Sequence, residues 1–251
     1  MIKAVIFDLG FTLVGNEDFT IPKYLKMLDK GINNVANYLR EEGVLKKRDI
    51  KRFIRRFKKL RYETFDRSFK ENIEYSSEYV LEKTLEALEI EYNDDLIKKS
   101  AGIYHVNESK FWKPFPNTQE TLKKIKNMGI KIALLSNGPY DRGIRTLLEI
   151  LDLKRYFDLI ETSANIGHAK PHPKTFNTVI KKLGLKHNET IMVGDDLLND
   201  CKGAADLNIM NIKVKKPFDF PYEKELDFTP DYTVDEIKEV PKIIMKINKN
   251  L

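Results

Sequence analysis

The sequence has a single cysteine, Cys201, among its 251 residues. One thiol cannot form an internal disulfide or a cysteine-built zinc site, so we expect a reducing, cytoplasmic location. The sequence also lacks any run of about 18 apolar residues, which excludes a membrane-spanning helix. It enters an apolar segment at Ile2 without a basic leader, so we expect no secretory signal.

A strong excess of one charge is missing as well. The 44 Lys and Arg residues and 38 Asp and Glu residues leave a net charge of +6, without the dense tail of a dedicated nucleic-acid arm. Residues 46–61 hold ten Lys and Arg and one acid. We interpret this segment as the solvated face of a helix, paired with the glutamates between residues 78 and 89, rather than as a nucleic-acid or membrane surface.

Short apolar runs that contain β-branched residues predict strands buried on both faces, as in a parallel sheet. The predicted strands are residues 2–7, 130–135, 159–161, 190–193 and 208–214. Amphipathic helical patterns occupy residues 117–129 and 174–183, and Asn117 with Glu120 predicts a capping box at the start of the first. Alternating strands and helices predict an α/β fold with a doubly wound, Rossmann-like parallel sheet.

Residues 15–112 differ from this alternation because they carry helical stripes and no convincing strand. One apolar stripe recurs at helical spacing over residues 50–60, and a second covers residues 75–88. We therefore predict an inserted helical cap over residues 15–112. The α/β catalytic core is then formed by residues 1–14 and 113–251.

Polar residues follow the predicted strands at several points. Four of these polar residues are Asp8, Ser136, Lys170 and Asp195. We expect no functional polar residue at the end of the strand at 208–214. Ligands of such sheets bind beyond the carboxyl ends of the strands. We therefore expect these four side chains to meet in one crevice.

Four motifs carry a family resemblance. They are Asp8-Leu9-Gly10-Phe11-Thr12-Leu13-Val14, Ser136, Lys170-Pro171 and Gly194-Asp195-Asp196-Leu197-Leu198-Asn199-Asp200. In this order, with a helical insertion after the first, the chain resembles the haloacid dehalogenase-like hydrolase superfamily, in its phosphatase branch with a helical cap. The resemblance covers essentially the whole chain.

The resemblance implies that Asp8 is a carboxylate nucleophile and that Mg²⁺ is the cofactor. Attack by a carboxylate on a phosphate dianion needs charge neutralisation, which Mg²⁺ and a lysine supply, and Mg²⁺ prefers oxygen ligands. The implied metal ligands are Asp8, the backbone carbonyl of Gly10, and Asp195, with Asp196 or Asp200 in support.

The remaining implied roles concern the phosphoryl group. Lys170 would hold the nucleophile and the transferring group as a compact cation. The Ser136 hydroxyl and the Asn137 backbone N–H would bind phosphoryl oxygens. Thr12 is either a supporting residue of the substrate site or an ordinary turn residue. The implied catalytic residues are thus Asp8, Ser136 and Lys170, and the implied substrate-binding residues are Thr12, Ser136, Asn137 and Lys170.

One position departs from the family pattern. Phosphatases of the family generally carry a second aspartate two residues after the nucleophile, where this sequence has Gly10. Glycine keeps the backbone carbonyl for the metal but loses a general acid and base, worth roughly 10²–10⁴-fold in rate. The candidates to replace it are Glu17, Asp18, Tyr140, Asp141, His168 and His172.

These observations predict Mg²⁺-dependent hydrolysis of a small phosphomonoester through a phospho-aspartate intermediate. The partner is a small phosphorylated metabolite, and both a monomer and a homodimer are compatible with the sequence. A 2-haloacid dehalogenase is one alternative, but the acidic cluster at Asp195, Asp196 and Asp200 favours a metal enzyme. The other alternative is a phosphate-ligand or protein-binding module that has lost turnover along with the usual acid at Gly10.

Overall fold

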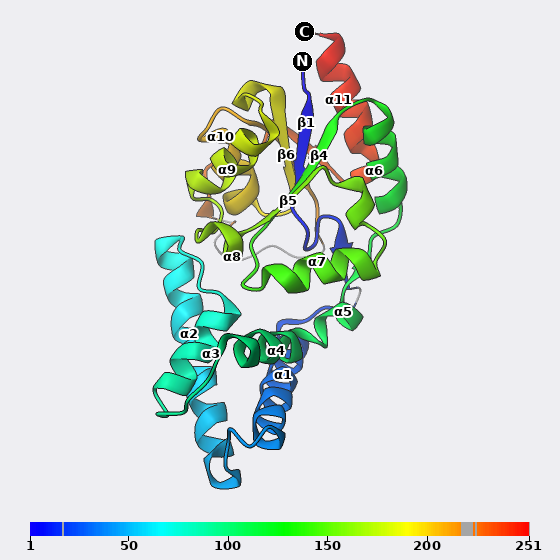
Figure 1. Cartoon of the computed structure of the whole chain (residues 1–251). Helices are drawn as coiled ribbons and strands as arrows, with labels where there is room; N and C mark the ends of the chain where they lie inside the picture. The colour runs from blue at the N-terminus through cyan, green and yellow to red at the C-terminus, as the bar shows by residue number, and fades with distance from the viewer. Residues whose placement is uncertain (17, 217–222, 224, 251) are drawn as a thin grey trace.

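The computed structural model describes residues 1–16, 18–216, 223 and 225–250. Figure 1 shows two lobes, one built around a sheet with both termini at its far end, the other made of helices. Six of the described strands form one parallel sheet in the order β5-β4-β1-β6-β7-β8. Their bounds are β1 Ala4–Phe7, β4 Lys131–Ser136, β5 Leu159–Thr162, β6 Thr190–Gly194, β7 Met210–Val214 and β8 Tyr232–Val234.

The strand order makes this sheet doubly wound. From β1 the chain passes outward through β4 to β5, then crosses to the other side of β1 and continues through β6 and β7 to β8. The predicted α/β fold is confirmed, and Asp8 follows β1 where the order reverses, which is where such sheets bind ligands. The strand β8 was not predicted because its three residues are too few to show a period.

The side chains of the central strand alternate between two layers. Val5 and Phe7 lie in one core with the helices α6, α7 and α11, whereas Ala4 and Ile6 lie in a second core with α9 and α10. Both faces of the sheet are covered, which explains its uninterrupted apolar runs. The helices of this lobe are α6 Thr118–Asn127, α7 Asp141–Ile150, α8 Ser163–Ile166, α9 Pro173–Leu183, α10 Gly203–Ala205 and α11 Val240–Lys249.

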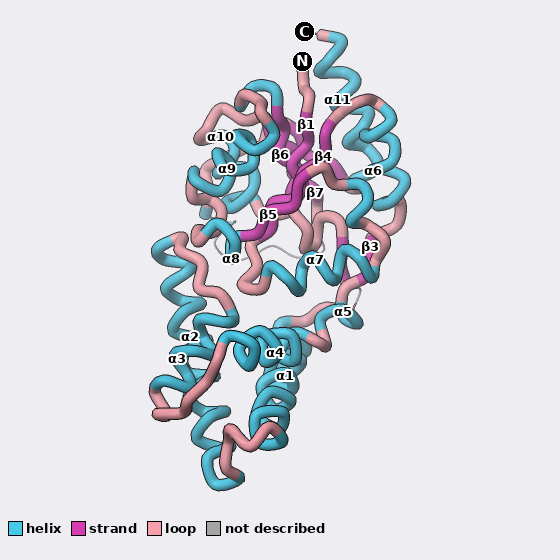
Figure 2. Tube along the Cα trace, in the orientation of Figure 1, coloured by secondary structure: helices cyan, strands magenta, loops and turns pink. Residues whose placement is uncertain are grey.

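The helical lobe is inserted between two short antiparallel strands, β2 (Val14–Gly15) and β3 (Lys113–Pro114). Figure 2 shows helices joined by loops in this part of the chain. The lobe has a hydrophobic core of its own, with Phe53, Phe57 and Leu81 fully buried. Its helices are α1 Ile21–Glu41, α2 Ile50–Glu71, α3 Ser77–Glu86, α4 Asp94–His105 and α5 Glu108–Phe111. Among the described residues, no helix combines the length and the apolar character that crossing a membrane requires.

Two local predictions were wrong. The helix α3, expected over residues 75–88, begins only at Ser77, where the Ser76 hydroxyl accepts from the Tyr79 N–H, and ends at Glu86, so Tyr75 and Leu88 lie outside it. The helix α6 has no capping box, because Asn117 is left-handed (φ 66°) and its side chain makes no capping hydrogen bond. In both cases the sequence pattern identified a helix but did not determine where its first turn begins or which backbone angles the residue before it adopts.

The predicted pairing of the basic helix with the acidic one was also wrong. Lys58 lies 2.8 Å and Arg61 lies 3.8 Å from the Asp29 carboxylate of α1. Lys59 pairs with Glu63 on α2 itself. Among the described residues, no ion pair joins residues 46–61 to the glutamates of α3, although α2 and α3 pack together through apolar side chains.

A glycine allows α1 to approach α4. A Cβ placed on Gly31 would lie 2.2 Å from the backbone carbonyl oxygen of Tyr104. Glycine inside a helix ordinarily costs about 1 kcal/mol relative to alanine, so local propensity alone favours replacing it. The close contact with backbone, which cannot rotate away, opposes that preference.

Gly31→Ala should therefore destabilise the protein by about 1–3 kcal/mol, because the added methyl group overpacks the α1–α4 contact. The matched control is Gly102→Ala in α4, whose Cβ would lie 3.4 Å from the Tyr140 hydroxyl, an ordinary contact distance. This control should be neutral or stabilising by up to about 1 kcal/mol. Urea unfolding measures both, and equal stabilisation by the two substitutions would contradict the packing argument.

Candidate active site

The first polar residue of the site extends directly from the central strand. Asp8 follows β1, and its N–H donates to the carbonyl of Val193 on β6 at 2.9 Å. The Thr12 hydroxyl lies 3.1 Å from Asp195 Oδ1 and 3.4 Å from Asp8 Oδ2. Thr12 is fully buried and lies between the two carboxylates, so the structure places it at the candidate site, and its role as a supporting residue of the substrate site stays a prediction.

A buried ammonium group joins two further members of the site. Lys170 Nζ lies 2.7 Å from Asp8 Oδ1 and 2.6 Å from Asp200 Oδ1, and only 1% of its side chain is exposed. Burial by itself lowers the pKa of Lys170, but the Asp200 and Asp8 carboxylates outweigh burial and hold the pKa above the ordinary lysine value. Lys170 is therefore a permanent cation between two carboxylates.

Three carboxylates crowd this position. Ligand oxygens of Asp8, Asp195 and Asp200 lie within 4.8 Å of one another. Burial and the negative charge of Asp8 raise the pKa of Asp195 to about 6, against the attraction of Lys216. Burial also raises the pKa of Asp200, although Lys170 opposes it. Clustered carboxylate oxygens with excess negative charge are the donor set that a hard divalent cation takes, so these residues fit a metal of the Mg²⁺ class.

The turn after β6 places Asp200 and Asp196 differently. A Cβ on Gly194 would lie 2.1 Å from Asp200 Oδ2, so only glycine leaves room for this carboxylate. The Asp196 carboxylate instead caps the wide helical turn Leu197–Lys202, accepting from the Leu198 and Asn199 N–H groups at 2.9 and 2.8 Å. The structure thus brings Asp200 to Asp8 and Asp195, while a metal-binding role for Asp196 stays a prediction.

Three charged residues around Asp195 were not predicted: Lys213 on β7, Lys216 just past its end, and Glu223 further along the chain. Lys213 and Lys216 both donate to the backbone carbonyl of Asp195, at 2.9 and 3.2 Å, and Lys216 also lies 3.0 Å from Asp195 Oδ2. Glu223 holds both lysines at 3.1 Å. The expectation that no functional polar residue lies at the end of this strand was therefore wrong. Lysines just past the carboxyl end of a strand were the available signal.

The strand β4 delivers the loop expected to bind phosphate. Ser136 ends β4 and is 5% exposed. The Asn137 side chain accepts from the Lys170 N–H at 2.7 Å and donates to the Lys170 carbonyl at 3.0 Å. The Asn137 side chain thus holds Lys170 in place, while its backbone N–H as a phosphate ligand stays a prediction.

The candidate replacements for the missing acid have other surroundings. Asp141 lies 2.7 Å from Arg145 Nε and 2.8 Å from the Thr162 hydroxyl. The Tyr140 ring stacks on His105 of the helical lobe. The structure also places Asp18 at the exposed surface and stacks His168 on His172 beside Lys170, and Glu17 lies outside the described residues. Among the described residues, none of these candidates forms a hydrogen bond or an ion pair with Asp8, whose side-chain partners are Thr12 and Lys170.

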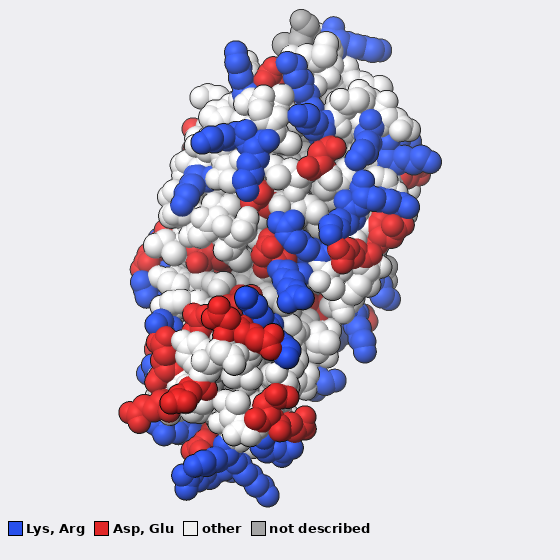
Figure 3. Space-filling model, viewed as in Figure 1, with Lys and Arg blue, Asp and Glu red and all other residues white. Residues whose placement is uncertain are grey.

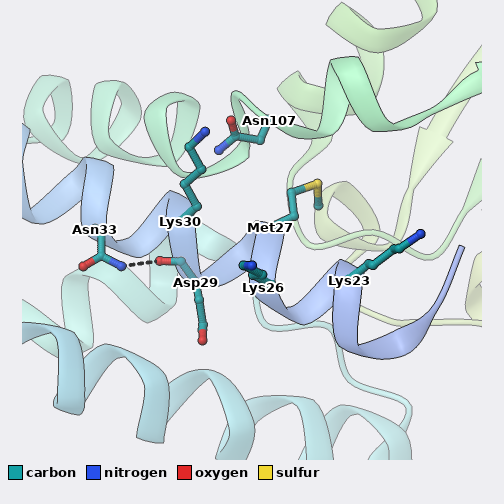
Figure 4. Close-up of a pocket in the computed structure, with 7 residues that line it drawn as sticks. All are labelled: Lys23, Lys26, Met27, Asp29, Lys30, Asn33 and Asn107. Carbon is teal, nitrogen blue, oxygen red and sulfur yellow. Dashed lines mark hydrogen bonds between the residues drawn. The ribbon is translucent and has the colours of Figure 1, made fainter. Parts of the chain in front are cut away.

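A hollow in the helical lobe lies away from the carboxylate cluster. On the face shown in Figure 3, basic and acidic side chains are interspersed. The hollow has a volume of about 600 Å³ and is lined by Lys23, Lys26, Met27, Asp29, Lys30, Asn33 and Asn107, which Figure 4 shows as sticks. Its lysines are exposed to solvent, and it contains none of the clustered carboxylates. The end of the sheet therefore remains the candidate active site.

A family model described as a haloacid dehalogenase-like hydrolase matches residues 2–208, so the chain belongs to this family of hydrolases. It is 26% identical to the glyceraldehyde 3-phosphate phosphatase of Methanocaldococcus jannaschii, over 100% of both chains. It is 28% identical to the pyrophosphatase PpaX of Oceanobacillus iheyensis, over 72% of this chain and 87% of that protein.

Solved structures show the same fold. A HAD phosphatase from Thermococcus onnurineus matches with a TM-score of 0.59 and 22% identity, covering 97% of this chain and 98% of that one. A 2-haloacid dehalogenase from Pseudomonas syringae matches with a TM-score of 0.68 and 21% identity, covering 98% and 100%. The family includes both activities, so the local chemistry of the site must distinguish them.

Cation binding at the carboxylate cluster should stabilise the folded protein. With Mg²⁺ at about 100 times its dissociation constant, we expect about 2.7 kcal/mol of stabilisation and a higher Tm. Asp195→Asn should abolish most of this gain because it removes one of the negative charges that the cluster offers to a cation. Asp66→Asn, at an exposed aspartate of α2 that pairs with Lys70, is the matched control and should keep the full gain. Thermal melts of each variant with and without Mg²⁺ measure the gain in Tm. An unchanged gain in Asp195→Asn would show that Asp195 does not bind the cation.

Proposed function

We propose that the protein is a Mg²⁺-dependent phosphatase that hydrolyses a small phosphomonoester through a phospho-Asp8 intermediate. The observation that carries this proposal is the buried arrangement of Asp8, Lys170, Asp195 and Asp200 at the point where the strand order reverses. Carboxylates within reach of one another beside a fixed cation suit the transfer of a charged phosphoryl group.

The chain's own residues supply most of the chemistry. Asp8 attacks phosphorus and forms an acyl phosphate, releasing the alcohol, and water then attacks this phosphorus and restores the carboxylate. Lys170 orients Asp8 and neutralises charge on the transferring group. Ser136 and the N–H of Asn137 would bind its equatorial oxygens. Asp8, the Gly10 carbonyl, Asp195 and Asp200 would hold a Mg²⁺ ion, which would supply Lewis-acid neutralisation of the phosphate.

The helical lobe fits the role of a cap that closes over the substrate. We propose residues 15–112 as this cap and residues 1–14 and 113–251 as the catalytic core, since the insertion begins and ends at the β2–β3 pair. The relatives' names support a small phosphorylated metabolite as substrate. Closure would exclude bulk water from the phosphoryl group.

Asp8→Asn should lower the turnover of an activated aryl phosphate by roughly 10³-fold or more, because an amide cannot act as the nucleophile. Acid-quenched wild-type protein should carry phosphate on Asp8, detectable by mass spectrometry, and the variant should not. Asp66→Asn, at an exposed aspartate of α2, is the control and should retain full rate. Turnover of the Asp8 variant at the wild-type rate would refute the covalent route. Halide release from a 2-haloacid in the presence of a chelator would favour a dehalogenase instead.

Gly10→Asp should speed the hydrolysis of alkyl phosphates by roughly 10- to 100-fold, since it adds a proton donor for a poor leaving group. The site has room for it, because a Cβ on Gly10 meets nothing within 4 Å and the Gly10 backbone is not left-handed. Activated aryl phosphates should gain little, because their leaving groups need no proton. Gly10→Ala is the control for the backbone change. An equal gain for both substitutions would rule out general acid catalysis as the reason.

A further inference from the structure

The segment between α2 and α3 lies against the loop that precedes Lys170. The Glu74 N–H donates to the Gly167 carbonyl at 3.2 Å, and the Ala169 N–H donates to the Asn72 carbonyl at 3.0 Å. Together these bonds form a short antiparallel bridge between the two lobes. The helical lobe is therefore bonded to the residue next to Lys170, at a point far along the chain from the β2–β3 pair.

The side chain of Glu74 is linked through Ser163 to the loop that follows β4, at Gly138. Ser163 Oγ donates to Glu74 Oε2 at 2.6 Å. The same Oγ accepts from the Gly138 N–H at 2.8 Å. Gly138 lies two residues after Ser136, so a carboxylate of the helical lobe is linked to the loop expected to bind phosphate.

The hydroxyl of Ser163 can donate only one hydrogen. Two acceptors compete for it, because the Gly138 carbonyl oxygen lies 3.3 Å from Ser163 Oγ and Glu74 Oε2 lies at 2.6 Å. The shorter bond to a carboxylate is the stronger one. Glu74 thus fixes the orientation of the hydroxyl and leaves an oxygen lone pair directed at the Gly138 N–H. Ser163 is fully buried, so water does not offer an alternative partner.

We propose that Glu74 is a positioning residue for the phosphate-binding loop: through Ser163 it fixes residues 136–138 when the helical lobe is seated on the core. This inference rests on the proposed phosphatase function. It extends to Lys170, because Asn137 in the same loop binds both the N–H and the carbonyl of Lys170. The helical lobe would then affect the rate by completing the site and not only by covering it.

Kinetics of Glu74→Ala, with Mg²⁺ and an aryl phosphate, test this role. We expect kcat to fall by roughly 10- to 100-fold, because the loop that stabilises the transferring group loses its support. KM should stay within a factor of about two, which separates loop positioning from weaker substrate binding. Glu74→Gln should retain most of the wild-type kcat, since its amide oxygen still accepts from Ser163. A loss in Glu74→Gln equal to that in Glu74→Ala would overturn the hydrogen-bond account.

A double-mutant cycle tests the path through Ser163. Ser163→Ala should lower kcat as much as Glu74→Ala, and combining the two should cause no further loss, because both break the same link. Glu71→Ala is the matched control, since Glu71 is an exposed glutamate three residues earlier that pairs with Arg67. Additive losses from the two site variants, or a comparable loss in the control, would overturn the proposal.

Hydrogen exchange supplies a readout that needs no turnover. In Glu74→Ala the Gly138 amide should exchange faster than in the wild type, whereas amides of β1 should not change. An unchanged Gly138 rate would refute the positioning role. If the wild type hydrolyses no phosphate ester, the phosphatase proposal fails, and the exchange experiment still decides whether Glu74 supports the loop.

Discussion

The site depends on one buried ammonium group held between two carboxylates. Lys170 contacts Asp8 and Asp200, which reach it from different strands of the sheet. A charge buried in protein is tolerated only when it is paired and hydrogen-bonded, so each of these groups needs the others. Features around the pair preserve it: Gly194 leaves space for Asp200, and Asn137 holds the backbone of Lys170.

The charges around Lys170 also depend on the need to pair buried ionic groups. Asp195 adds a third carboxylate to a cluster that Lys170 alone cannot neutralise, and its pKa rises to about 6 by burial and repulsion from Asp8. Lys216 and a divalent cation are two ways of compensating the excess. The same excess favours the proposed phosphoryl transfer over halide displacement, because a phosphate dianion requires the cations that such a cluster gathers.

The two lobes are connected by polar contacts as well as by the β2–β3 pair, where the chain passes from one lobe to the other. The Ser77 N–H donates to the Pro139 carbonyl at 2.8 Å, and its hydroxyl lies 2.7 Å from His105 Nε2. His105 Nδ1 lies 2.7 Å from Glu108, and the His105 ring stacks on Tyr140, two residues beyond Gly138. This buried chain and the Glu74–Ser163 link both connect the helical lobe to the loop that follows β4, which is the loop proposed to bind phosphate.

The sequence by itself predicted five of the six strands of the parallel sheet and the polar residues that follow them. Buried parallel strands are continuous apolar runs, and chain direction places the residues after them at one edge, which is why Asp8, Lys170 and Asp195 could be brought together in advance. Only the tertiary structure brought Asp200 beside Asp8 and Asp195, placed Lys216 against Asp195, and linked Glu74 to Ser163. These choices depend on contacts between segments far apart in the chain, and no local period encodes which distant side chain a folded backbone brings within hydrogen-bonding distance.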